Sequence, residues 1–80
     1  MATQVERVCF HLDNPLTVWD NRDGGNIELA PGNYSCHPQV RQNLTLYYVY
    51  KADDNYVPQG YSILHCWLRV EDDSSINFGN

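Results

Sequence analysis

The sequence predicts an all-β domain, a small antiparallel barrel or sandwich of five to six strands with Greek-key-like connections. Apolar and polar residues alternate with a period of two over several short segments, which is the pattern of half-buried strands. Turn-forming Asn, Asp, Gly and Pro residues separate these segments. No segment shows an extended helical period, so at most one helical turn is expected. A chain of 80 residues makes a single domain, over residues 1–80.

The first three expected strands are short, and turn residues bound each of them. They occupy residues 5–12, 16–20 and 26–29. The letters DNP end the first strand, because Asp and Asn hydrogen-bond their own backbone and Pro fixes φ. The letters NRDGG join the second strand to the third, because Asp-Gly and Gly-Gly accept the positive φ of a hairpin loop.

The second half of the chain holds the longest apolar segments. Residues 35–43 show no clear period, and we expect a loop there or one helical turn around Val40. Residues 44–51 are rich in β-branched and aromatic side chains and predict a strand. Residues 61–70 predict another strand, with large apolar side chains on both faces. The acidic residues that follow predict a loose tail, over about 72–80, with an apolar side chain or two docked.

The letters VWDNRDGGNIELAPGNYS resemble part of a βγ-crystallin Greek-key motif. In that motif an aromatic residue opens a hairpin, a Gly follows in the fold-over, and Leu-x-Pro-Gly-x-Tyr closes it. The matching residues are Trp19, Gly25, Leu29, Gly32 and Tyr34. The spacing to Gly25 is one residue short, and the calcium motif of the family is absent. The resemblance supports a β fold, and it implies an alternative function as a calcium-binding module.

The charge balance of the chain indicates the class of partner. Ten acidic residues face five basic ones, which gives a net charge of -5. Phosphate neutralisation by Lys and Arg supplies most of the affinity for nucleic acid, so direct binding to nucleic acid is not expected. The excess of acid favours a partner with a basic surface. Neither a membrane span nor a signal peptide is recognisable, and we expect a cytoplasmic protein unless a signal was removed.

The cysteine and histidine residues give no strong signal for a metal or for catalysis. Three cysteines, an odd number, predict reduced thiols without a complete disulfide framework. Each lies within two residues of a histidine, but His65 and Cys66 would point to opposite faces of a strand and the chain has no Cys-x-x-Cys knuckle, so no zinc site or other cofactor is expected. Cys36 and His37 are the best candidates for a nucleophile and its base, yet no oxyanion site accompanies them. The sequence therefore predicts a protein that is not an enzyme.

An aromatic surface is the main candidate for a functional site. If the strands at residues 44–51 and 61–70 pair, apolar side chains gather on one face. That predicted partner-binding face consists of Tyr47, Val49, Tyr61, Ile63, His65 and Trp67. The alternative is that another part of the chain covers this face as a second core layer. Homodimerisation through the same face is a further expectation.

The function expected from these observations is that of a small acidic protein-binding module. One specific form is a phage-type inhibitor that occupies the basic, nucleic-acid-binding surface of a host protein. Its acidic surface would imitate phosphates and consists of Asp53, Asp54, Glu71, Asp72 and Asp73. The alternative from another class is the βγ-crystallin-like calcium-binding module, stabilised by ions at the turns.

Overall fold

Strands make up the regular structure of the computed structural model, which describes residues 7–70 and 76–79. The described residues form no helix. Seven strands occur in this part of the chain: β1 (Val8–Leu12), β2 (Leu16–Asp20), β3 (Gly25–Leu29), β4 (Gly32–Arg41), β5 (Leu44–Ala52), β6 (Leu64–Val70) and β7 (Ile76–Gly79). The all-β prediction is confirmed, with one or two strands more than expected.

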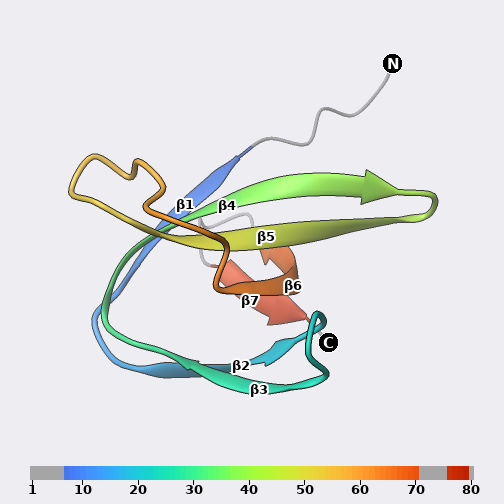
Figure 1. Ribbon diagram of the computed structural model, residues 1–80, viewed down its shortest axis with the longest axis horizontal. Helices are drawn as coiled ribbons and strands as arrows, with labels where there is room; N and C mark the ends of the chain where they lie inside the picture. Colours follow the sequence, from blue (N-terminus) through green and yellow to red (C-terminus); the bar gives the residue numbers. More distant parts are fainter. Residues whose placement is uncertain (1–6, 71–75, 80) are drawn as a thin grey trace.

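The strands form one large antiparallel sheet and one small one (Figure 1). The five-stranded sheet has the order β1-β4-β5-β6-β7 and curls until it is nearly closed into a barrel. The β2–β3 hairpin is a separate sheet that lies below the β4–β5 pair in Figure 1. At the open side of the large sheet, the rings of Phe10 in β1 and Phe78 in β7 meet edge to face, with centroids 5.4 Å apart.

The loop or helical turn predicted for residues 35–43 is wrong, because most of this segment belongs to β4. Tyr34, Ser35 and Cys36 are buried in succession and the last three residues of β4 are exposed, so burial changes along the strand and not with a period of two. The sequence therefore shows no strand alternation there. Pro38 fits there because β1 pairs with β4 only as far as Cys36, which leaves β4 an edge strand on that side.

The predicted loose tail is also partly wrong. Residues 76–79 form β7, which pairs with the second half of β6 and places Phe78 opposite Leu68. Both side chains pack against the core, so alternating apolar residues convert the end of the chain into an edge strand. Residues 71–75 and 80 lie outside the described residues.

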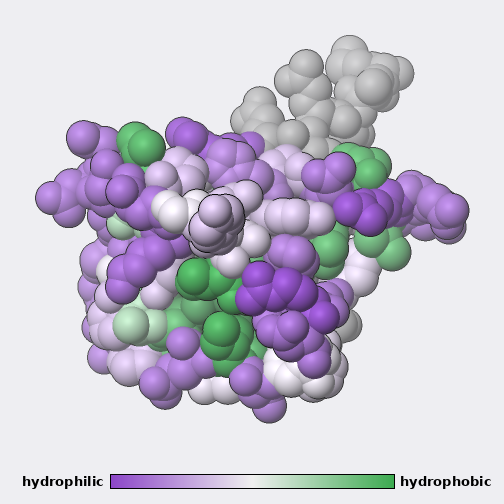
Figure 2. All heavy atoms as spheres, viewed as in Figure 1, coloured by the Kyte–Doolittle hydropathy of each residue, from purple (hydrophilic) through white to green (hydrophobic). Residues whose placement is uncertain are grey.

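The hydrophobic core lies between the concave face of the large sheet and the β2–β3 hairpin. The buried apolar residues are Phe10, Val18, Leu29, Tyr34, Cys36, Val49, Leu64 and Cys66. Figure 2 shows strongly apolar side chains near the centre of the face drawn in Figure 1, with hydrophilic residues around them. The core therefore reaches the surface between the two layers on that side.

The segment that resembles a Greek-key motif forms β2, β3 and the start of β4. Gly24 adopts a φ of 70° in the hairpin turn, a conformation that a side chain would disfavour. Tyr34 stacks on Phe10 with ring centroids 5.3 Å apart, and its hydroxyl donates a hydrogen bond to the carbonyl of Ala30. The buried tyrosine thus ties the β3–β4 connection to the core.

Replacing Leu64 with Ala should lower the free energy of unfolding by about 2–5 kcal/mol, because it opens a cavity in the core. Urea denaturation measures this change. Leu44→Ala is the matched control, since Leu44 is 42% exposed, and it should change the free energy by less than about 1 kcal/mol. Equal losses from the two variants would contradict the placement of the core.

Candidate functional site

The register between β5 and β6 decides which aromatic residues share a face. The predicted pairing of these strands is confirmed, and it places Tyr48 opposite His65 and Val49 opposite Leu64. Val49 is therefore an inward core residue with no measurable exposure. Tyr47 lies opposite the buried Cys66, and burial, followed by the nearby Cys36, raises its pKa.

The predicted six-residue face is therefore divided, and its prediction as one surface is wrong. Tyr47 and Val49 share the inner face with Leu64, whereas His65 and Trp67 lie on the outer face. Ile63 precedes β6 and packs against the core. A slip of one residue between two strands moves every side chain to the other face, and the sequence alone gave no means of setting this register.

The outer face of the large sheet carries a different group of rings. His37, Tyr48 and His65 lie directly opposite one another on β4, β5 and β6. Tyr48 stacks on His65 with centroids 4.0 Å apart, and Tyr50 meets His37 edge to face at 5.2 Å. We call His37, Tyr48, Tyr50, His65 and Trp67 the ring strip. Its members are all partly buried, because they cover one another.

Arginine residues surround the ring strip. The guanidinium of Arg41 donates a hydrogen bond of 3.2 Å to the hydroxyl of Tyr48. Arg69 follows Trp67 on the same face of β6, and a Cβ added at Gly79 would meet both side chains. Arg7 directly precedes Val8, which lies opposite Cys36 on β4, and the charge of Arg7 lowers the pKa of His37. Both charge and ring area are therefore concentrated on this face.

The two histidines of the ring strip favour their neutral form. Burial lowers the pKa of His37 below its usual value of 6.5, and Arg7 lowers it further. Burial also lowers the pKa of His65, and the charge of Arg22 acts in the same direction. Each ring makes one hydrogen bond with a serine hydroxyl. His37 bonds to Ser35 at 3.4 Å, and His65 bonds to Ser62 at 3.3 Å. At neutral pH the positive charge of the strip therefore comes from arginine.

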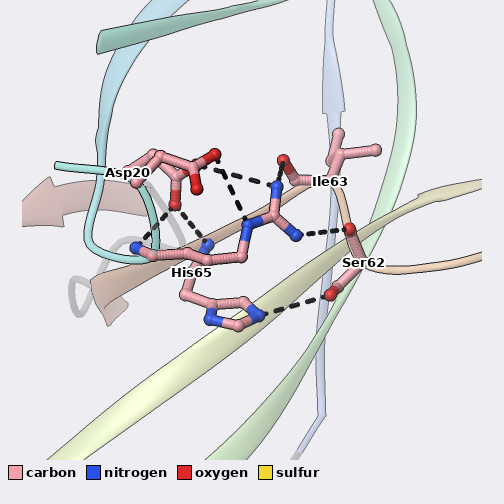
Figure 3. A network of polar contacts seen from close by, with 6 residues as sticks. Asp20, Ser62, Ile63 and His65 are labelled. Carbon is pink, nitrogen blue, oxygen red and sulfur yellow. Dashed lines mark hydrogen bonds and ion pairs between the residues drawn. The ribbon is translucent and has the colours of Figure 1, made fainter. Parts of the chain in front are cut away.

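A buried carboxylate fixes the position of β6 relative to the β2–β3 hairpin (Figure 3). Asp20 is 3% exposed, and one of its oxygens accepts the backbone N–H groups of His65 and Arg22, at 3.1 and 2.9 Å. The neighbouring N–H of Asn21 donates to the carbonyl of His65 at 2.7 Å. Both backbone groups of His65 are thus bonded to the hairpin, which anchors the ring strip at its β6 end.

Arg22 extends this network to the segment before β6. Its guanidinium donates to the carbonyls of Ser62 and Ile63 at 3.1 and 2.9 Å, and it lies 3.7 Å from Asp20. Burial would raise the pKa of Asp20, but the donated backbone hydrogen bonds and the charge of Arg22 hold this pKa below its usual value of 3.8. In the sequence, Asp20 and Arg22 look like residues of an ordinary turn, so their role in this network is not predictable.

The acidic loop between β5 and β6 is ordered by its own hydrogen bonds. The Asp53 carboxylate accepts the backbone N–H groups of Asn55 and Val57, both at 2.9 Å, and the side chain of Gln59 at 3.4 Å. Asp53 therefore organises the loop, while Asp54 is exposed. Tyr61, near the end of this segment, is 93% exposed. The remaining predicted acids, Glu71, Asp72 and Asp73, lie outside the described residues.

The cysteines do not form a thiol and imidazole pair. Cys36 is buried and His37 faces the outer side, so the best candidate pair is separated by the sheet. The exposed Cys9 contacts the Ser35 hydroxyl at 3.9 Å, with no imidazole in direct contact. Among the described residues, no three His, Cys, Asp or Glu side chains are grouped so that they could hold a metal ion.

In the part of the chain that the structure describes, hollows lie beside β1, β2 and β7. One, of about 350 Å³, lies between β1 and β7 and is lined mainly by apolar residues, with Cys9 and His11 at its rim. The other, of about 290 Å³, lies between β2 and β7 beside Trp19. Neither hollow includes a member of the ring strip. In the described part of the chain, no helix is long and apolar enough to cross a membrane.

Comparison with known protein families, with characterised proteins and with solved structures finds no match for this chain. The assignment of a function therefore depends on the geometry of the described surfaces. At the ring strip, aromatic residues, histidines and arginines from β4, β5 and β6 come together.

Replacing Asp20 with Asn should lower the free energy of unfolding by about 1–3 kcal/mol at neutral pH, because the bond network loses its charge. Since folding lowers the pKa of Asp20, its stabilising effect is present above 3.8 and is lost as the pH falls below that value. Urea denaturation as a function of pH should show this acid-sensitive component in the wild type and not in the variant. Identical pH profiles would contradict the network.

Only Cys9 should react with a thiol reagent in the native protein, because Cys36 and Cys66 are buried. Burial raises the pKa of Cys66 to about 12, and it also raises that of Cys36, so neither forms a thiolate at neutral pH. Absorbance from a disulfide reagent, read with and without denaturant, counts the reactive thiols. Rapid reaction of all three cysteines in native buffer would show that the core is not packed as described.

Proposed function

We propose that this protein is a non-enzymatic binding module that recognises another protein through the ring strip. The observation that supports this most is the partly exposed row of His37, Tyr48 and His65 across three strands, with Trp67 beside it. Tyr, Trp and Arg are the residues that contribute most at protein interfaces. A rigid sheet also presents such side chains with little loss of conformational freedom on binding.

The ring strip is pre-organised for this task. Tyr48 is held by its stack on His65 and by the hydrogen bond from Arg41, while His65 is fixed to the hairpin through Asp20. Side chains that are ordered before binding lose less entropy when a partner arrives. The inner face, by contrast, is filled by the core and the β2–β3 hairpin, so it offers no comparable surface.

Absence of catalysis belongs to the same proposal. The nucleophilic side chains that line the two hollows are Cys9 and Thr17, and the side-chain contact of Cys9 is with the Ser35 hydroxyl. A nucleophile needs an adjacent base and a group that stabilises the developing negative charge. The described residues bring no such set together.

A narrower proposal is that the protein is an inhibitor whose exposed carboxylates, at the end of the acidic loop, imitate phosphates. Tyr61 and Asp54 are exposed there, beside an ordered turn. Asp53 is less suited to imitate a phosphate, because both of its oxygens accept hydrogen bonds from its own loop. Binding to a basic protein that weakens steeply with salt, and that is lost in Asp54→Lys, would support this form. Salt-insensitive binding would exclude it.

Trp67→Ser should abolish binding to the partner and leave the fold intact, whereas Trp19→Ser should leave binding unchanged. Both variants remove one indole, but Trp19 lies on the hairpin and is 42% exposed outside the ring strip. Immobilised wild type and variants are compared for the proteins that they retain from a cell extract, with circular dichroism to check folding. Equal retention by Trp67→Ser and the wild type would contradict the proposal.

Light scattering on the same samples tests self-association. A wild-type dimer that becomes a folded monomer in Trp67→Ser would identify the partner as a second copy of the chain. A monomeric wild type whose Trp67→Ser variant unfolds would place Trp67 in the core and exclude it as a binding residue.

A further inference from the structure

We propose that the partner of the ring strip is a protein segment with Asp or Glu side chains around an apolar or aromatic centre. This inference rests on the proposed function, because it specifies the partner of the same surface. It also reverses the charge expected from composition, since a chain with a net charge of -5 would be matched with a basic partner. The reason lies in the distribution of the charges.

The charges of the described residues are separated by location. Arg41 and Arg69 flank the ring strip on the outer face of the large sheet, and Arg7 directly precedes Val8 of β1, which lies opposite Cys36. In the described strands of this sheet, no residue that points to the outer face is acidic. The described acidic residues lie instead in turns, in the β2–β3 hairpin and in the β5–β6 loop, and they are Asp13, Asp20, Asp23, Glu28, Asp53 and Asp54.

Each arginine is placed to bind a carboxylate at the rim of a contact centred on the rings. Arg41 makes one hydrogen bond, to the Tyr48 hydroxyl, which leaves other donors of its fork free among the described contacts. Arg69 is exposed next to Trp67. A guanidinium binds a carboxylate through two parallel hydrogen bonds, so acidic side chains that flank an apolar centre match this arrangement.

A protein partner fits the rings better than single-stranded nucleic acid does. Bases bind by stacking on open aromatic faces, whereas one face of Tyr48 is already stacked on His65, at an angle of 22° between the planes. The net charge of -5 also repels a polyphosphate at long range. A short acidic peptide segment carries less negative charge than a polynucleotide. It can bind through contacts with ring edges and aliphatic groups and through ion pairs with the arginines.

A second copy of this chain fits the surface poorly when the same faces meet. A two-fold contact through the ring strip brings the two sets of Arg41 and Arg69 together, and like charges in an interface are unfavourable. Charge therefore favours a different protein over a symmetrical homodimer.

A displayed library of random peptides, selected on the full-length protein, tests this inference. The best peptide is labelled, and its affinity is measured by fluorescence polarisation for wild type, Trp67→Ser and the double variant Arg41→Glu with Arg69→Glu. Lys51→Glu is the control for charge, because it makes the charge change of one of the two arginine substitutions at an exposed residue outside the ring strip. Circular dichroism checks the folding of every variant, and oligothymidylate is added as a competitor.

The expected result is a set of selected peptides rich in Asp and Glu around aromatic or aliphatic residues. The double arginine variant should bind them at least about tenfold more weakly, and Lys51→Glu less than about twofold more weakly. Selected peptides that are basic or uncharged, but that still need Trp67, would overturn the inference and keep the proposed function. Peptides that bind Trp67→Ser as well as the wild type, or no selected peptides, would overturn both. Oligothymidylate that displaces the peptide would identify nucleic acid as the ligand and overturn the inference.

Discussion

The buried carboxylate of Asp20 is the contact on which the arrangement of the two sheets depends. The β2–β3 hairpin has no strand pairing with the large sheet, and its apolar side chains alone would allow it to slide across the core. Asp20 and Asn21 remove that freedom because they bond to the backbone of a single residue, His65. A directional polar contact at the end of a hydrophobic layer thus selects one docking position.

The same contact links the interior to the outer surface. The backbone of His65 is hydrogen-bonded to the hairpin, and the ring of His65 stacks on Tyr48 on the outer face. Arg22, which pairs with Asp20, also fixes the carbonyls that precede β6. The geometry of the ring strip therefore depends on packing within the core and on the hairpin, and not only on its own residues.

The class of fold and most strand positions are predictable from the sequence, because hydrophobic alternation reflects burial directly. The part of β4 after Cys36 is not predictable in this way, because its residues are partly or fully exposed on both faces and include Pro38, and β7 is not because an acidic segment precedes Ile76. The surface was harder to predict. Tyr47 and Tyr48 are both plausible outer residues until the register with β6 is known, and register depends on turn geometry and on partners far apart in the chain.

The net charge describes the chain as a whole and does not show how the charges are distributed over its faces. A sum over 80 residues conceals the fact that the arginines near the ring strip and the acids of the turns occupy different places in space. Arg41 and Arg69 lie at outer-face positions of strands, whereas most of the described acids lie in turns and loops, where Asp is favoured for local reasons.

The strand order of the large sheet explains why its barrel stays open. Every neighbouring pair is antiparallel and the sheet has five strands, so β1 and β7 run in the same direction. Direct closure would require a parallel pair, whose slanted hydrogen bonds do not continue the antiparallel ladder. The contact between Phe10 and Phe78 brings the two edges together through side chains alone. With an odd number of antiparallel strands, the two edge strands of this barrel cannot continue the antiparallel hydrogen bonding, however well the core is packed.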